Sequence, residues 1–163
     1  MQKISVIIDT FSWKKLGIIE KQENILNSLY DAVNVCITHE ILKEIKHFQL
    51  TTCDSSRVHI LPTKQNRIYQ DSKTLGFDEA DASLISNIIK TEEYIGVTED
   101  QPLLSYGTKN GFNIMQLLDL FQFLTAHNKL TKNSLYNITK ELRNLKNITK
   151  KKEKDMKKWL QIN

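Results

Sequence analysis

Short apolar runs alternate with longer amphipathic stretches along most of the chain. Residues 3–9 form a mainly apolar, β-branched run that ends abruptly on Asp9. Such a run is typical of a strand in a parallel sheet that is covered on both faces. Further strands are predicted at 33–37, at 57–61 as a short edge strand, at 94–97 and at 112–115.

The stretches between these runs carry apolar residues at helical spacing. Thr38 and Asp78 are typical N-cap residues, and Gly76 is a typical helix stop. Strands that alternate with helices predict a three-layer α/β/α fold with a central parallel sheet of four or five strands. The helices are predicted at about 12–30, 38–48, 64–75, 78–89, 103–111 and 116–127.

The chain divides by charge at about residue 128. Residues 1–128 contain 12 Lys and Arg against 16 Asp and Glu, whereas residues 129–163 contain 11 Lys and Arg against 3 Asp and Glu. The second segment has no strand pattern and predicts two basic helices. We therefore expect an α/β domain over 1–128 and a basic helical extension over 129–163. The asymmetry indicates either a polyanionic partner or solvated helix faces.

Composition narrows the class of protein. Of the 163 residues, 40% are hydrophobic and 26% are charged, which excludes collagen-like and wholly disordered chains. No apolar run is long enough to cross a bilayer, and the first residues do not have the pattern of a secretory signal. Cys36 and Cys53 have no CxxC spacing, which excludes a zinc knuckle and a disulfide framework. We expect a cytoplasmic protein without a membrane partner.

Acidic residues gather where the predicted strands end. Asp9 and Asp100 each follow a strand, Glu44 lies two turns into the helix after the second strand, and Asp81 lies in the first turn of another helix. The carboxyl ends of parallel strands open onto one crevice. Four carboxylates there would repel each other, and a hard divalent cation such as Mg²⁺ or Mn²⁺ would relieve the repulsion. Two such ions could activate water against a phosphodiester.

In order and spacing, these motifs resemble the PIN-domain nucleases, compact α/β domains found among toxin ribonucleases and in RNA processing. The resemblance covers about residues 3–120, and the helical tail resembles that of a prokaryotic subgroup. It implies that the catalytic, metal-binding acids are Asp9, Glu44, Asp81 and Asp100. The stretches that match are Val6–Thr10, Ile37–Ile45, Gly76–Ala82 and Val97–Asp100.

The chain departs from the family pattern at a few positions. Phe11 stands where relatives often carry Asn or Ser, and the adjacent Ser12 could take that role. Some relatives carry a Gly-Glu motif that makes Glu79 an alternative to Asp81. Glu99 is likewise an alternative to Asp100. The residues expected to support the acids are Thr10, Ser12, Thr98 and Glu99, and the Thr98 hydroxyl could orient a carboxylate or a bound water.

The resemblance implies a metal-dependent endoribonuclease that hydrolyses RNA with Mg²⁺ or Mn²⁺. Basic residues of the tail could hold the RNA backbone through salt-sensitive contacts. If the protein is the toxin of a toxin–antitoxin pair, a small antitoxin protein would cover the crevice. The tail residues assigned to nucleic-acid binding are Lys146, Lys150, Lys151 and Lys152.

Two other functions fit parts of the pattern. A degenerate PIN-like module would bind RNA or a protein partner without cutting, although the presence of all four acids argues against it. A phospho-accepting receiver needs paired acids at the first strand and a lysine after the last strand, and this chain has neither. Apolar residues at 117–124 could form a homodimer, but we favour their burial under the C-terminal helices.

Overall fold

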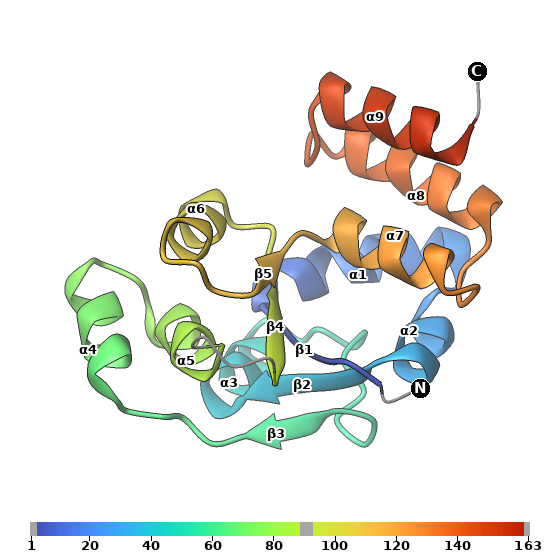
Figure 1. Cartoon of the computed structure of the whole chain (residues 1–163). Coiled ribbons are helices and arrows are strands. Elements are labelled where there is room, and N and C mark those ends of the chain that lie inside the picture. Colours follow the sequence, from blue (N-terminus) through green and yellow to red (C-terminus); the bar gives the residue numbers. More distant parts are fainter. Residues whose placement is uncertain (1–2, 89–92, 162–163) are drawn as a thin grey trace.

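The computed structural model describes residues 3–88 and 93–161, and within these residues the centre is a five-stranded sheet (Figure 1). Every neighbouring pair of strands is parallel. The spatial order of the strands is β3-β2-β1-β4-β5. The predicted α/β fold with a parallel sheet is confirmed. The strands are β1 (Ser5–Ile8), β2 (Asn34–Thr38), β3 (His59–Leu61), β4 (Tyr94–Val97) and β5 (Ile114–Met115).

Helices connect the strands and continue beyond the last of them. Thr38 and Asp78 cap their helices as the sequence predicts: Thr38 Oγ1 accepts from the amide of Ile41, and Asp78 Oδ1 accepts from the amide of Asp81. Ile89, the last residue of the helix predicted over 78–89, lies outside the described residues. The helices are α1 (Thr10–Glu23), α2 (Leu26–Ala32), α3 (His39–His47), α4 (Arg67–Thr74), α5 (Glu79–Asn87), α6 (Gln101–Lys109), α7 (Leu117–Ala126), α8 (Lys132–Asn144) and α9 (Lys150–Leu160).

The single helix predicted over 12–30 is wrong, because this segment forms parts of α1 and α2. Asn24 ends α1 in the left-handed conformation, with φ of 48°, which Asn tolerates better than most residues. The Glu20 side chain then accepts a hydrogen bond of 2.8 Å from the amide of Leu26. The break turns the chain so that Leu29 and Tyr30 of α2 are buried.

β1 and β4 lie side by side at the centre of the sheet, and the chain leaves them in opposite directions. β1 leads through α1 and α2 to β2, whereas β4 leads through α6 to β5 on the other side. Because crossovers between parallel strands are almost always right-handed, this change of direction predicts connecting helices on opposite faces of the sheet. The carboxyl ends of β1 and β4 therefore border a crevice, which is where doubly wound sheets bind their ligands.

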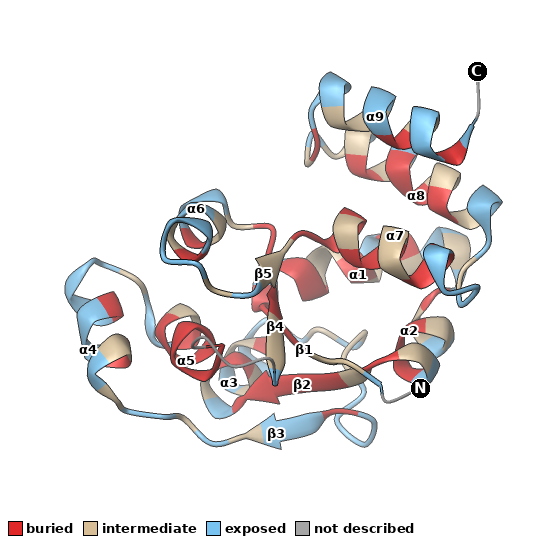
Figure 2. Cartoon of the chain, in the orientation of Figure 1, coloured by how far each residue is buried: buried red, intermediate tan, exposed pale blue. Residues whose placement is uncertain are grey.

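The hydrophobic core continues from the sheet into the C-terminal helices (Figure 2). Helix α8 packs against α7 and α1, and α9 packs against α8. The apolar side chains of α7 are thus buried within one chain, in line with the interpretation we favoured over a homodimer. None of the described helices is long and apolar enough to cross a membrane. The buried residues of α7 include Leu117, Leu118, Leu120, Phe121 and Leu124.

Candidate active site

The four acids singled out by sequence line one pocket of about 240 Å³. They come from four separate segments: the β1–α1 junction, α3, the first turn of α5 and the β4–α6 junction. The fold thus brings together residues that are up to 91 positions apart in the sequence. The pocket is lined by Asp9, Glu44, Asp81 and Asp100 together with Thr10, Phe11, Lys14, Phe48, Asp78 and Ala80.

Asp9 is fixed by the backbone at the switch between β1 and α1. It is the N-cap of α1, and its Oδ1 accepts a hydrogen bond of 2.6 Å from the amide of Ser12. Its other oxygen, Oδ2, accepts from the Thr98 hydroxyl. Burial raises the pKa of Asp9 to about 6, and the hydrogen bonds from Ser12 and Thr98 oppose this rise. Asp9 therefore has a defined orientation, at an energetic cost that a bound cation would reduce.

Thr98 connects Asp9 to Asp100. Its hydroxyl donates to Asp9 and accepts a hydrogen bond of 3.0 Å from the amide of Asp100. Asp100 is in turn the N-cap of α6, since its Oδ1 accepts from the amide of Leu103 at 2.8 Å. Thr98 is fully buried, so the two carboxylates at the ends of β1 and β4 are held through one rigid side chain.

Glu44 and Asp81 are positioned by the packing of α3 against α5. The hydroxyl of Thr10 donates to Glu44 Oε2, which joins α3 to the start of α1. At the beginning of α3, the Thr38 hydroxyl lies 2.6 Å from the Ser83 hydroxyl of α5. This buried contact fixes the two helices to each other and thereby sets the separation of their acids.

Crowding of negative charge is most evident at Asp81. Its pKa is raised to about 8 by burial, and then by the charges of Asp78, Asp9, Asp100 and Glu44. Asp78, which sequence interpreted only as a cap, therefore contributes a fifth carboxylate to the pocket. Such mutual repulsion in a partly buried pocket is the electrostatic condition that a divalent cation relieves.

The structure separates the acids that sequence left as alternatives. Asp81 and Asp100 line the pocket, whereas Glu79 and Glu99 are not among its lining residues. Glu79 is exposed on the first turn of α5. Glu99 is 5% exposed and lies in a different polar network. The geometry thus favours Asp81 and Asp100 as the acids of the pocket.

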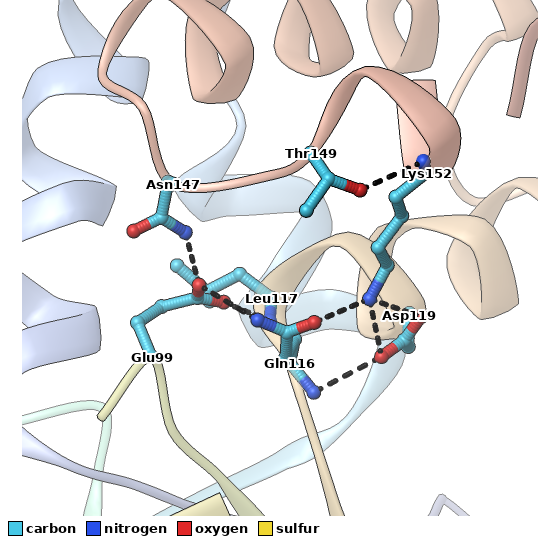
Figure 3. A network of polar contacts seen from close by, with 7 residues as sticks. All are labelled: Glu99, Gln116, Leu117, Asp119, Asn147, Thr149 and Lys152. Carbon is cyan, nitrogen blue, oxygen red and sulfur yellow. Dashed lines mark hydrogen bonds and ion pairs between the residues drawn. The ribbon is translucent and has the colours of Figure 1, made fainter. Parts of the chain in front are cut away.

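Glu99 links the sheet to the C-terminal extension (Figure 3). Its carboxylate accepts from the amide of Leu117 at 2.6 Å and from the side chains of Gln116 and Asn147. Burial raises the pKa of Glu99, and the hydrogen bonds from Leu117 and Asn147 oppose this rise. The expected support of the acids by Glu99 is thus indirect, through the chain that continues into Asp100.

The basic residues assigned to nucleic-acid binding have different environments. Lys152 is half-buried, and its ammonium lies 2.5 Å from Gln116 Oε1 and 3.0 Å from Asp119 Oδ1 (Figure 3). Lys146, Lys150 and Lys151 are exposed.

A basic cleft is lined by Arg143, Lys146 and Lys152. Its other lining residues are Gln101, Gln116, Asn147, Ile148 and Thr149. Since Gln101 follows Asp100, this basic cleft adjoins the acidic pocket.

The acidic side chains of the pocket are of the chemical type that binds a hard divalent cation. All of its acidic groups are carboxylates, and oxygen ligands are what Mg²⁺ and Mn²⁺ prefer. Among the described residues, however, no three His, Cys, Asp or Glu side chains are grouped closely enough to hold a metal as they stand. Mutual repulsion keeps uncompensated carboxylates apart, so side-chain rotation would have to accompany binding of a cation.

Phe11, Lys14 and Phe48 also line the pocket, although they were not predicted from the sequence to do so. Phe11 and Lys14 lie one turn apart on α1, and Phe48 follows α3. Phe11 was noted only as a departure from the family pattern. The signal that could have found it is its place two residues after Asp9, whereas Phe48 becomes part of the pocket only through the packing of α3.

No protein-family model and no curated protein matches the sequence. Two solved archaeal structures are similar to this one. A PilT N-terminus domain protein, SSO1118, from the hyperthermophilic archaeon Sulfolobus solfataricus P2 shares 12% identity over 74% of this chain and 93% of its own, with a TM-score of 0.47. PAE2754 from Pyrobaculum aerophilum shares 17% identity over 76% of this chain and 90% of its own, with a TM-score of 0.51. The likeness to PAE2754 shows that the two chains share a fold.

Proposed function

We propose that this protein is a metal-dependent endoribonuclease of the PIN type, which hydrolyses phosphodiester bonds of RNA. The observation that carries the proposal is the convergence of Asp9, Glu44, Asp81 and Asp100 on one pocket at the switch point of the sheet. The PIN-domain family that the motifs resemble includes nucleases, and this supports the reaction class. RNA rather than DNA rests on that resemblance.

Each acid has a role that follows from its surroundings. Asp9 and Asp100, both held by Thr98 and by helix amides, are oriented residues suited to direct cation ligation. Glu44 on α3 and Asp81 on α5 line the same pocket and would supply further carboxylate oxygens to a bound cation. When bound, Mg²⁺ or Mn²⁺ supplies Lewis acidity toward the phosphate and makes water a better nucleophile at neutral pH. The charge of Lys14 at the same pocket attracts the phosphate backbone.

The basic cleft beside the pocket supplies further contacts to the RNA backbone. Lys146 lines this cleft, and Lys150 and Lys151 extend from the exposed start of α9. Their charge would offset the repulsion between an acidic pocket and a polyanion. Lys152 contributes less directly, because its ammonium already pairs with Asp119.

Cleavage of a labelled RNA panel in Mn²⁺ tests the proposal. We expect Asp9→Asn and Asp100→Asn to reduce cleavage by orders of magnitude, because each removes a charge that holds the cation. Both variants should fold, since Asn can still accept the helix-capping hydrogen bond. Excess EDTA should abolish cleavage by the unaltered protein.

Glu79→Gln is the matched control for these variants. Glu79 lies on the same turn of α5 as Asp81 but is exposed and outside the pocket, so its substitution should leave cleavage unchanged. Activity that survives Asp9→Asn or EDTA would show a different mechanism or a contaminating nuclease, and the proposal would be wrong.

A second candidate function is a module that binds RNA or protein without cutting. The spacing of the carboxylates favours it, because within the described part of the chain no three of them form a ready metal site. The two candidates differ in one measurement. Titration calorimetry with Mn²⁺ should show binding that Asp9→Asn removes if the protein is a nuclease, and no binding if it is a non-catalytic module.

A further inference from the structure

Two exposed aromatic side chains line the acidic pocket. In the described part of the chain, three aromatic residues belong to the exposed large hydrophobics: Phe11, Phe48 and Trp159. Phe11 is 46% exposed and Phe48 is 48% exposed, and both line the pocket. Single exposed apolar residues are common, but here two exposed aromatic rings line the same candidate catalytic pocket, which indicates a shared role.

The two rings are attached to the same elements as the candidate cation ligands. Phe11 lies two residues after Asp9 in the first turn of α1, and Phe48 lies one turn after Glu44 at the end of α3. The amide of Phe48 donates to the carbonyl of Glu44 at 2.8 Å. Because α1 packs against α3, the rings and the acids keep a fixed relation to each other.

Positive charge accompanies both rings. The ammonium of Lys14 lies 3.5 Å from the centroid of the Phe48 ring, and that of Lys15 lies 5.2 Å from the centroid of the Phe11 ring. In the free protein each ammonium lies over its ring. A nucleotide matches this pair, because its phosphate can draw the ammonium away and its base can then stack on the ring. A helical duplex cannot use such rings, because its bases are already stacked and paired.

On the premise of the proposed function, we propose that Phe11 and Phe48 stack the unpaired bases of nucleotides beside the cleaved phosphate. The inference concerns the role of these two side chains, which would contact bases that are not already stacked in a duplex. The competing occupant is an apolar segment of a protein partner inserted between the rings. The cations at the rings and the continuity with the acidic pocket favour the nucleic acid.

Binding measured without cleavage tests this inference. In an Asp9→Asn background with Mg²⁺, the affinity for a single-stranded RNA that carries 2-aminopurine is followed by anisotropy, and stacking by quenching of the 2-aminopurine. We expect Phe11→Leu and Phe48→Leu each to weaken binding by about tenfold and to reduce quenching, as loss of one stacked base does. Phe48→Tyr, which keeps the aromatic face, should retain affinity and quenching.

Trp159→Leu is the matched control, because it removes an exposed aromatic residue of α9 that is outside the pocket. It should leave affinity unchanged, and an RNA duplex of the same sequence should bind at least about tenfold more weakly than the single strand. Unchanged affinity in both Phe→Leu variants would overturn the inference and leave the rings as a protein contact. Equal binding of duplex and single strand would also overturn it. Failure of the unaltered protein to cleave RNA would instead contradict the proposed function, so the two are distinguishable.

Discussion

Asp81 is the acid on which the crowding of the pocket acts most strongly. Its pKa is raised from 3.8 to about 8, so the folded protein binds a proton there that the unfolded chain releases. The stability of the metal-free protein should therefore fall as the pH rises from about 4 to about 8. In EDTA, Asp81→Asn should melt close to the unaltered protein at pH near 4, and above it with a difference that grows toward pH 8.

Thermal melts across this pH range measure the effect. Asp155→Asn, at an exposed position of α9, is the control for loss of one carboxylate outside the pocket. Adding Mn²⁺ at the higher pH should stabilise the unaltered protein more than Asp81→Asn, because the cation binds the ionised form. A difference between Asp81→Asn and the unaltered protein that is constant with pH would contradict the electrostatic account of the pocket.

The acids of the pocket could be identified from sequence because their placement is local. Asp9 directly follows an apolar strand, Asp100 lies three residues after the end of another, and Asp81 falls in the first turn after a cap. These positions indicated the acids together with the family resemblance, but they left Glu79 and Glu99 as alternatives. Phe48 and Lys14 could not be identified in this way, because an exposed aromatic or lysine has no local signature. Their relation to the acids exists only after α1 packs on α3.

Glu99 joins the sheet to the start of α7 and to the α8–α9 turn through contacts that span 17 to 48 positions of the sequence. We expect these contacts to add to the attachment that packing gives α8 and α9. Asn147→Ala removes one donor to this buried carboxylate and leaves its charge less well satisfied. We expect a loss of about 1–3 kcal/mol in the free energy of unfolding. Amide hydrogen exchange at 145–149 should also become faster, since this turn would be less firmly attached.

Asn144→Ala is the control for this variant, because Asn144 is the exposed last residue of α8. Chemical denaturation and hydrogen exchange are measured for both variants. If Asn147→Ala is as stable as Asn144→Ala and exchanges no faster at 145–149, then Glu99 does not hold the extension to the sheet.

Most elements could be predicted from sequence because each begins or ends at a residue with a clear local preference. Thr38, Asp78 and Gly76 are examples, and the structure has helix boundaries at or next to them. The break between α1 and α2 was missed because it depends on one Asn in the left-handed conformation and on a side-chain contact of Glu20. The partners of Glu99 were missed because they are distant in sequence.

The whole molecule combines an acidic α/β body with a basic extension that packs on α7 and α1. The extension shares the hydrophobic core of the body, so its charge is held at a fixed place beside the acidic pocket. A polyanion bound at the acids would therefore lie near this basic surface. Unlike a flexible tail, the packed extension therefore holds its positive charge at a defined position relative to the acids.

The salt dependence of RNA binding tests this arrangement. Replacing Lys146, Lys150 and Lys151 together with Gln should weaken binding and make the slope of log K against log salt shallower by about 2, at roughly 0.7 for each lost contact to a single strand. Lys152 is left unchanged because it pairs with Asp119. The matched control replaces Lys21, Lys73 and Lys109, which are exposed lysines of the body, and carries the same change of net charge. A slope reduced equally in both variants would mean that only total charge matters, and an unchanged slope in the first would mean that the extension is a solvated face without a role in binding RNA.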